Sequence, residues 1–181
     1  MNKTRIERIY VWDRFVRTFH WTLVGCIIFN YIIADDGKQA HQLSGYMASA
    51  MVAVRIIWGF LGSPHARFSD FFPTPSRIKE HVAKMIKGDP DFQPGHNPLG
   101  GLMMLTLIAL VLGLGISGHL QTTDAFWGEE WLETLHEGLA STLIALACLH
   151  VAAALVMSRL QQTNLVGAMV TGFKTHRQDA G

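Results

Sequence analysis

Charged residues and cysteines are scarce in this chain of 181 residues. Asp, Glu, Lys and Arg make up 16% of the sequence, against roughly 25% in soluble domains. The two cysteines, Cys26 and Cys148, both fall within apolar runs, and this pattern does not indicate a disulfide framework. The sequence has no Cys-x-x-Cys-His motif, which excludes covalent attachment of a c-type haem. The composition therefore argues against a soluble domain and against a disulfide-rich secreted one.

Long apolar runs are what the sequence has instead. Hydrophobic residues make up 49% of the chain, and they concentrate in four runs at about residues 18–34, 43–62, 99–118 and 138–157. A helix needs roughly 17 to 25 residues to cross the hydrocarbon core of a bilayer, and the third run contains no ionisable residue. The sequence predicts an all-α fold, an integral membrane four-transmembrane-helix bundle that forms a single domain over residues 1–181.

Basic residues are distributed unequally between the connecting segments. Thirteen lysines and arginines lie before the first run, in the connection of residues 63–97 and in the C-terminal tail, whereas the other side has only Lys38. The positive-inside rule then puts the N- and C-termini and the 63–97 loop in the cytoplasm. We expect Trp12, Trp21 and Trp58 to anchor this side in the membrane interface. No small-residue cleavage pattern follows the first run, so we expect a retained helix and not a signal peptide.

Four of the nine histidines lie near the ends of the predicted spans. His20 and His150 are near the cytoplasmic ends of the first and fourth spans, and His41 and His136 are near the outer ends of the second and fourth. The offset of fourteen residues from His136 to His150 puts both on one helix face, about 21 Å apart along the axis. We therefore predict two centres, an outer pair of His41 with His136 and an inner pair of His20 with His150. His119, at the outer end of the third span, is an alternative to either outer histidine.

Haem fits between two histidines on facing helices, because iron takes axial imidazoles on both sides of the macrocycle. Zinc prefers a compact set of four ligands, and a di-iron centre needs several inward-facing glutamates; neither pattern is present. The expected cofactors are thus two non-covalent b haems, ligated by His20, His41, His136 and His150. Because both axial positions are filled, we predict electron transfer and assign no catalytic residue.

One arginine lies inside a predicted span. Arg55 is in the second span towards its cytoplasmic end, and an intramembrane arginine is costly unless it has a function. A guanidinium group binds carboxylates bidentately, so Arg55 is a candidate for the propionates of the inner haem, with Arg17 as a second candidate. Snorkelling of Arg55 to the interface is the alternative.

Seven motifs distributed from residue 11 to residue 172 resemble the bacterial b-type cytochromes, the family that includes the cytochrome b subunit of nickel–iron hydrogenases and cytochrome b-561. The motifs are VWDRFVRTFHW (11–21), HQLSGY (41–46), RIIWGFLGSPHARFSDF (55–71), GHNPLGG (95–101), LHEGLA (135–140), LHVAAAL (149–155) and NLVGAMVTG (164–172). The resemblance implies a four-helix bundle with two b haems and selects the same four histidines.

The resemblance also implies the partners. We expect electron transfer between the quinone pool and a periplasmic redox protein, either a c-type cytochrome or a hydrogenase, in a bacterial inner membrane. Whether the chain acts by itself as a quinone oxidoreductase stays open, as does the place of a quinone site. A homodimer is also expected, and no nucleic acid. The alternative from another functional class is a small transporter or proton-conducting protein that uses the histidines as a relay.

Overall fold

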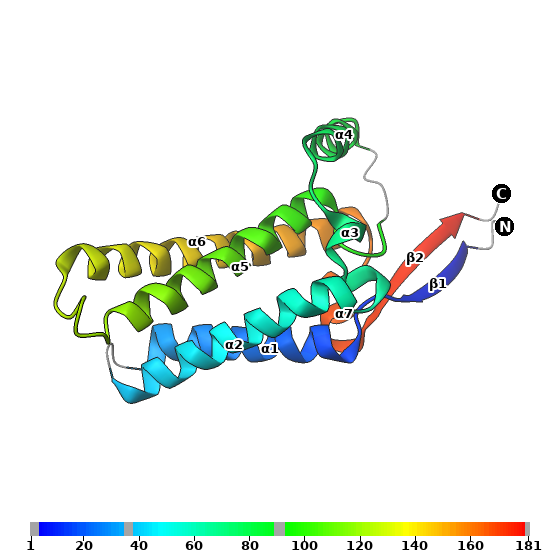
Figure 1. Ribbon diagram of the computed structural model, residues 1–181. Coiled ribbons are helices and arrows are strands. Elements are labelled where there is room, and N and C mark those ends of the chain that lie inside the picture. Colours follow the sequence, from blue (N-terminus) through cyan, green and yellow to red (C-terminus); the bar gives the residue numbers. More distant parts are fainter. Residues whose placement is uncertain (1–3, 35–37, 89–92, 180–181) are drawn as a thin grey trace. The chain divides into compact units, whose positions relative to one another are not determined.

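Four long helices dominate the computed structural model, which describes residues 4–34, 38–88 and 93–179. Each is long and apolar enough to cross a membrane. The first is α1 (Arg14–Ile28), which continues as a π-helical turn, η1 (Phe29–Ile33); the others are α2 (Gln39–Leu61), α5 (Pro98–Leu120) and α6 (Glu130–Leu160) (Figure 1). These helices contain nearly all of the four predicted spans. The protein is an all-α integral membrane bundle, as predicted.

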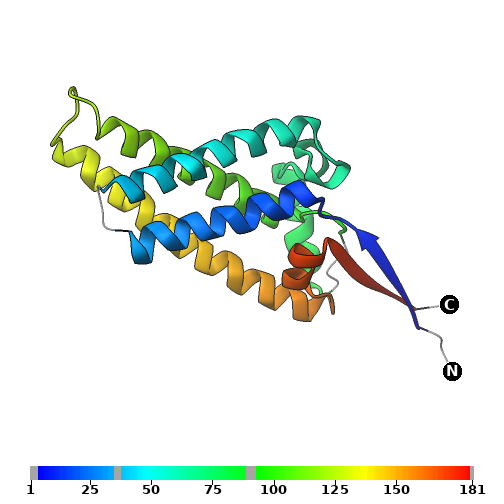
Figure 2. The same ribbon diagram turned by 90° about the horizontal axis from the view of Figure 1, so that it is seen from below.

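Shorter elements lie between and beyond the long helices (Figure 2). They are β1 (Thr4–Tyr10), η2 (Pro64–Ala66), α3 (Phe68–Phe71), α4 (Pro75–Ile86), α7 (Leu165–Thr171) and β2 (Phe173–Asp179). The two strands pair antiparallel, with Tyr10 opposite Phe173. The sequence did not predict this two-stranded sheet, which joins segments near the two ends of the chain.

The chain divides into two compact units, each of which is described by itself. One unit comprises residues 18–57 and 104–148, and it contains a segment of each long helix. Its buried side chains are mostly apolar: Phe19, Cys26, Ala48, Val52, Ile108, Val111, Leu132 and Leu143. Small residues permit close packing of α2 and α5 in this unit. A Cβ atom on Gly115 would overlap the side chain of Ser49, which explains a glycine in the middle of a helix despite its helix-weakening effect.

The other unit comprises residues 1–17, 58–103 and 149–181. Asp13 organises it, because its Oδ1 atom caps α1 by accepting the backbone N–H of Val16 at 2.8 Å. The Oδ2 atom accepts from Trp58 Nε1 at 3.0 Å and from Ser63 Oγ at 2.6 Å. One carboxylate therefore fixes the start of α1, the end of α2 and the segment that follows it.

The termini are tied to this unit through α7. Gly172 ends α7 with φ of 89°, a conformation that glycine adopts without strain, and its carbonyl accepts the N–H groups of Val11 and Trp12. Trp12 is only 4% exposed and packs in a core cluster with Val16 and Ala168. Its predicted role as a membrane-interface anchor is therefore wrong.

Candidate functional site

The two outer histidines face each other across two helices of one unit. His41 lies in the first turn of α2 and His136 in the second turn of α6. Their ring centroids are 6.3 Å apart, and the ring planes are inclined by 59°. Two imidazoles at this separation do not touch each other, so the space between them is wide enough for one metal ion.

Haem iron fits this separation quantitatively. A metal–imidazole nitrogen bond is about 2.0 Å long, and the ring centroid lies roughly 1.1 Å beyond the nitrogen, so two imidazoles that hold one iron have centroids about 6.2 Å apart. The distance between the His41 and His136 centroids, 6.3 Å, is close to this value. In addition, the described residues contain no group of three or more His, Cys, Asp and Glu side chains that could hold a metal ion. The donor set is thus two opposed imidazoles, which suits haem and does not suit a four-ligand zinc site.

Ser117 on α5 orients the ring of His136. The serine hydroxyl donates to the carbonyl of Leu114 at 3.3 Å, and the Oγ atom lies 2.8 Å from His136 Nδ1. A hydroxyl has one proton, so the geometry makes His136 Nδ1–H the donor and Ser117 Oγ the acceptor. This hydrogen bond leaves Nε2 of His136 without a proton and available to a metal, which is the usual arrangement for ligating histidines.

Gly118 makes room for the same ring. A Cβ atom at this position would approach Cε1 of His136 to 3.2 Å and Nδ1 to 3.7 Å. Sequence reasoning did not find Ser117 or Gly118. The only signal was a small polar residue next to a glycine in the apolar third span, and such pairs are also common where helices simply pack closely.

His119 has another partner in the structure. Its Nδ1 atom lies 3.1 Å from the hydroxyl of Tyr46 on α2, and the two rings meet edge to face at 6.0 Å. The geometry that matches an iron-bridged pair is that of His41 with His136, so His119 is the weaker alternative among the outer histidines.

The inner histidines lie on the predicted helices but in different units: His20 is in α1 and His150 is in α6. Their pairing stays a prediction. Arg55 on α2 is 1% exposed, and its Nη2 atom lies 3.7 Å from the Met104 sulfur on α5, so it does not snorkel to the surface of its unit. Arg17 donates through Nη1 to the Val170 carbonyl at 2.6 Å.

His41 and Arg55 lie too far apart along α2 to act at the same centre. Fourteen residues of helix correspond to about 21 Å, so Arg55 lies far from the ring of His41. A buried guanidinium within a membrane helix requires an anion or several acceptors. The assignment of Arg55 to a second, inner centre stays a prediction.

Comparison with known proteins also identifies b-type cytochromes. Residues 11–172 match the family described as prokaryotic cytochrome b561. The chain is 24% identical to a probable Ni/Fe-hydrogenase B-type cytochrome subunit of Rhodobacter capsulatus, over 97% of this chain and 84% of that protein. It is 21% identical to proteins of the same description from Bradyrhizobium diazoefficiens, over 93% of this chain and 87% of that protein, and from Azotobacter vinelandii, over 94% and 90%. No solved structure matches the chain significantly. Because the family match covers most of the sequence and agrees with the four long helices, the chain belongs to the prokaryotic cytochrome b561 family.

Proposed function

We propose that this b-type cytochrome binds two haems and carries electrons between the quinone pool and a redox protein on the outer face of the membrane. Its family membership makes it a bacterial membrane protein of electron transfer that holds haem b. The single observation that best supports the proposal is the 6.3 Å separation of the His41 and His136 ring centroids, which is close to the separation expected for two imidazoles that would hold one haem iron. The number of haems and the two electron-transfer partners belong to the proposal.

The outer haem is assigned to His41 and His136, and the inner haem to His20 and His150. When bound, each haem supplies a one-electron ferric–ferrous couple. At each site two histidines of the protein would ligate the haem iron, which would leave no coordination position for oxygen or substrate. Ser117 orients His136 through the 2.8 Å hydrogen bond.

Two arginines are assigned to the propionates of the inner haem. Arg55 is buried in α2 and would pair with an anion in an apolar environment, where a bidentate guanidinium–carboxylate contact is strong. Arg17 is the second candidate: its Nη1 atom is held by the Val170 carbonyl, and its buried Nε atom has no hydrogen-bond partner among the described residues. A propionate oxygen would satisfy that donor.

A hydrogenase is one proposed outer partner, because the relatives are described as subunits of Ni/Fe-hydrogenases; a c-type cytochrome is the other. The connection between α5 and α6 and the first turn of α6 together carry four acidic residues, Asp124, Glu129, Glu130 and Glu133, and no Lys or Arg, which favours association with a basic surface. The orientation with both termini in the cytoplasm follows the unequal distribution of Lys and Arg. A homodimer stays a prediction from the sequence.

Haem per polypeptide in detergent-purified protein tests the proposal directly. A pyridine haemochrome assay should give two b haems for the wild type and one for each of H41A and H136A. H119A is the matched control, since His119 also lies at the outer end of a span but bonds Tyr46, and it should retain two. One haem in the wild type would refute the two-centre assignment. Colourless protein made with ample haem would favour the transporter with a histidine relay.

A further inference from the structure

A polar cavity lies beside the start of α5, within the unit that contains the chain ends. Its volume is about 330 Å³, at the lower end of the roughly 300–1,000 Å³ of small-molecule pockets. It is lined by His65 of η2, by the α3 and α4 helices and by the segment of residues 93–98, and it is open to solvent. The haem assignments above use none of the residues that line it, although three of them are histidines: His65, His81 and His96.

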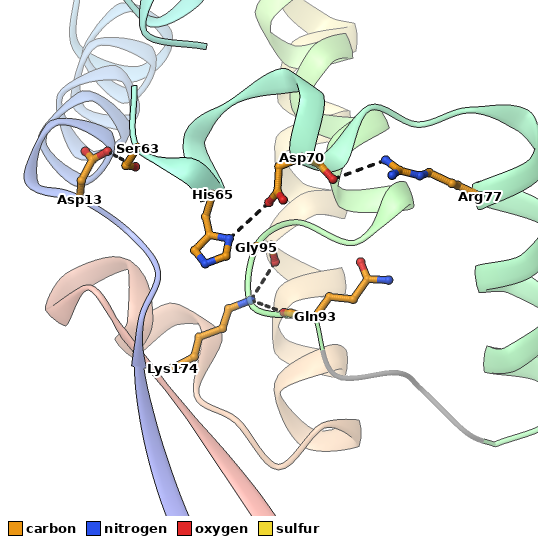
Figure 3. A network of polar contacts seen from close by, with 8 residues as sticks. All are labelled: Asp13, Ser63, His65, Asp70, Arg77, Gln93, Gly95 and Lys174. Carbon is orange, nitrogen blue, oxygen red and sulfur yellow. Dashed lines mark hydrogen bonds and ion pairs between the residues drawn. The ribbon is translucent and has the colours of Figure 1, made fainter. Parts of the chain in front are cut away.

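A histidine–aspartate pair forms part of the cavity wall. His65 Nδ1 and Asp70 Oδ2 are 3.3 Å apart (Figure 3), and the side chains are 29% and 42% exposed. The pair is therefore in reach of water and of the cavity at once. Gly95 lies against it, because a Cβ atom there would approach Asp70 Oδ2 to 2.9 Å. A carboxylate that orients an imidazole is the usual arrangement for a residue that accepts and releases a proton.

The charges that line the cavity balance. Arg77 and Lys84 contribute two positive charges, and Asp70 and Glu80 contribute two negative charges. With the histidines neutral the sum is zero, so the cavity has no net attraction for a phosphate group or for a cation. It suits a neutral molecule with hydrogen-bond acceptors. Phe71, which is 3% exposed, adds an aromatic surface to the lining.

The cavity walls are held by contacts with backbone carbonyls. Arg77 Nη1 lies 3.4 Å from the carbonyls of Asp70 and of Phe72. On the opposite wall, Lys174 Nζ donates to the carbonyls of Gln93 at 3.2 Å and of Gly95 at 3.0 Å (Figure 3). Lys174 belongs to β2 and is only 5% exposed. The terminal sheet thus holds the segment that carries Gly95 and His96 at the edge of the cavity.

The cavity adjoins the start of a membrane-spanning helix, because Pro98 lines it and is the first residue of α5. Leu99 and Leu102 follow Pro98 in α5 and are exposed, as are Phe72 next to the lining residue Phe71 and Ile86 two residues after Lys84. A ligand with a polar ring and an apolar tail suits a polar cavity whose lining residues have exposed apolar neighbours in the sequence.

We propose that this cavity binds the head group of a quinone and that His65 with Asp70 exchanges its protons. The inference rests on the proposed function, since reduced haem b supplies the electrons. On reduction the quinone gains two electrons, one at a time, and two protons. In its protonated form beside Asp70, His65 donates a proton to a quinone oxygen and becomes neutral, takes up a proton from the aqueous side, to which it is 29% exposed, and donates again. Quinol oxidation is the reverse, with both protons passing to the pair.

The test follows oxidation of the haem by a short-chain quinone. Intact protein, reduced stoichiometrically and without oxygen, is mixed with decylubiquinone or menadione, and the loss of the reduced haem band is recorded. H65Q keeps a side chain that forms hydrogen bonds but cannot carry a proton, and D70N removes the carboxylate charge at constant shape. We expect the maximal rate to fall roughly 100-fold in each, the usual effect of losing a proton-transfer group, with little change in the quinone concentration at half-saturation.

A second variant and a matched control complete the design. G95A leaves both reacting side chains in place but puts a methyl group against the Asp70 carboxylate, and it should also slow the reaction. Y46F and H119Q alter the hydrogen-bonded pair of the other unit, which is a rival site for the same chemistry, and they should react like the wild type. Haem content and the optical spectrum of each variant confirm that it is folded.

Each outcome decides between two proposals. Slow oxidation in H65Q, D70N and G95A with normal rates in Y46F and H119Q supports the assignment of the cavity as the quinone site. The reverse pattern, or normal rates in all variants, overturns this assignment and leaves the proposed electron transfer to quinone intact. Wild-type protein that ferricyanide oxidises but neither quinone does would refute the quinone half of the proposed function, and the cavity assignment with it.

Discussion

Replacement of Ser117 by alanine should raise the midpoint potential of the outer haem. Ser117 Oγ accepts a hydrogen bond from His136 Nδ1 at 2.8 Å, and this bond increases the electron density that the opposite ring nitrogen donates to iron. Greater donation stabilises ferric over ferrous iron, so the hydrogen bond lowers the potential. Because the serine hydroxyl donates its proton to Leu114, Ser117 acts on the histidine only as an acceptor.

The size of the shift follows from the strength of the hydrogen bond. A neutral hydrogen bond contributes about 1 kcal/mol. If all of it distinguished the two oxidation states, the one-electron potential would change by about 40 mV, since a tenfold change in equilibrium corresponds to about 59 mV. The expected increase in S117A is therefore between roughly 10 and 40 mV, and the potential of the other haem should not change.

A redox titration of the purified protein, followed at the reduced haem bands, measures both potentials. S49A is the matched control, because the Ser49 hydroxyl bonds the carbonyl of Gly45 in its own helix at 2.9 Å. An unchanged or lower potential in S117A, with haem content intact, would refute the assignment of Ser117 as acceptor. A shift in both potentials would indicate a general loosening of the bundle.

Three further predictions concern ligand access and stability. Reduced protein should not bind carbon monoxide, because the proposed histidine pairs would fill both axial positions of each haem; a large shift of the reduced Soret band under carbon monoxide would contradict this. D13A should lower the free energy of unfolding by about 2 to 4 kcal/mol, because α1 loses its cap and the donors of Trp58 and Ser63 lose their acceptor. The control D124A, in an exposed loop, should change it by less than about 0.5 kcal/mol. Equal midpoints of detergent-induced unfolding for the two variants would refute the role of Asp13. Burial lowers the pKa of Lys174 from 10.5 to about 8, so between these pH values the unfolded chain binds more protons than the folded protein. The free energy of unfolding should therefore rise with pH over this range, by about 3 kcal/mol at most. The rise in melting temperature from pH 7.5 to pH 9.5 should be smaller in K174M than in the wild type, and equal rises would exclude the burial of this amine.

The helices and the outer histidine pair were predictable because they depend on periodic and local signals. Hydrophobic run length gives the spans, and the depth of His41 and His136 within those spans selected the pair that the structure brings to 6.3 Å. Ser117 was not predictable in the same way. Its helix is apolar around its whole circumference, so the sequence gives no sign of which face meets α6.

The cavity and the terminal sheet were not predictable because both depend on long-range contacts. His65, His81 and His96 are separated by up to 31 positions in the sequence, and only the turns between α2 and α5 bring them around one space. The strands β1 and β2 are charged and distant in sequence. Their register, with Tyr10 opposite Phe173, is fixed by pairing across almost the full length of the chain, which no local pattern encodes.

The two proposed haem environments differ in a way that favours electron flow towards the cytoplasm. In the proposed orientation, an electron that moves inward works against the membrane potential, at about 2.3 kcal/mol per 100 mV for the full thickness. Centres about 21 Å apart across a core of about 30 Å experience roughly 70 mV of each 100 mV. The hydrogen bond that Ser117 accepts from His136 would lower the potential of the outer haem by up to about 40 mV, and the positive charge of Arg55 beside the inner haem would raise that of the inner haem. Both residues would therefore act in the direction that offsets this electrostatic cost. Quinone reduction at the proposed cavity would take up its protons through His65 from the cytoplasm, the side towards which the electrons move.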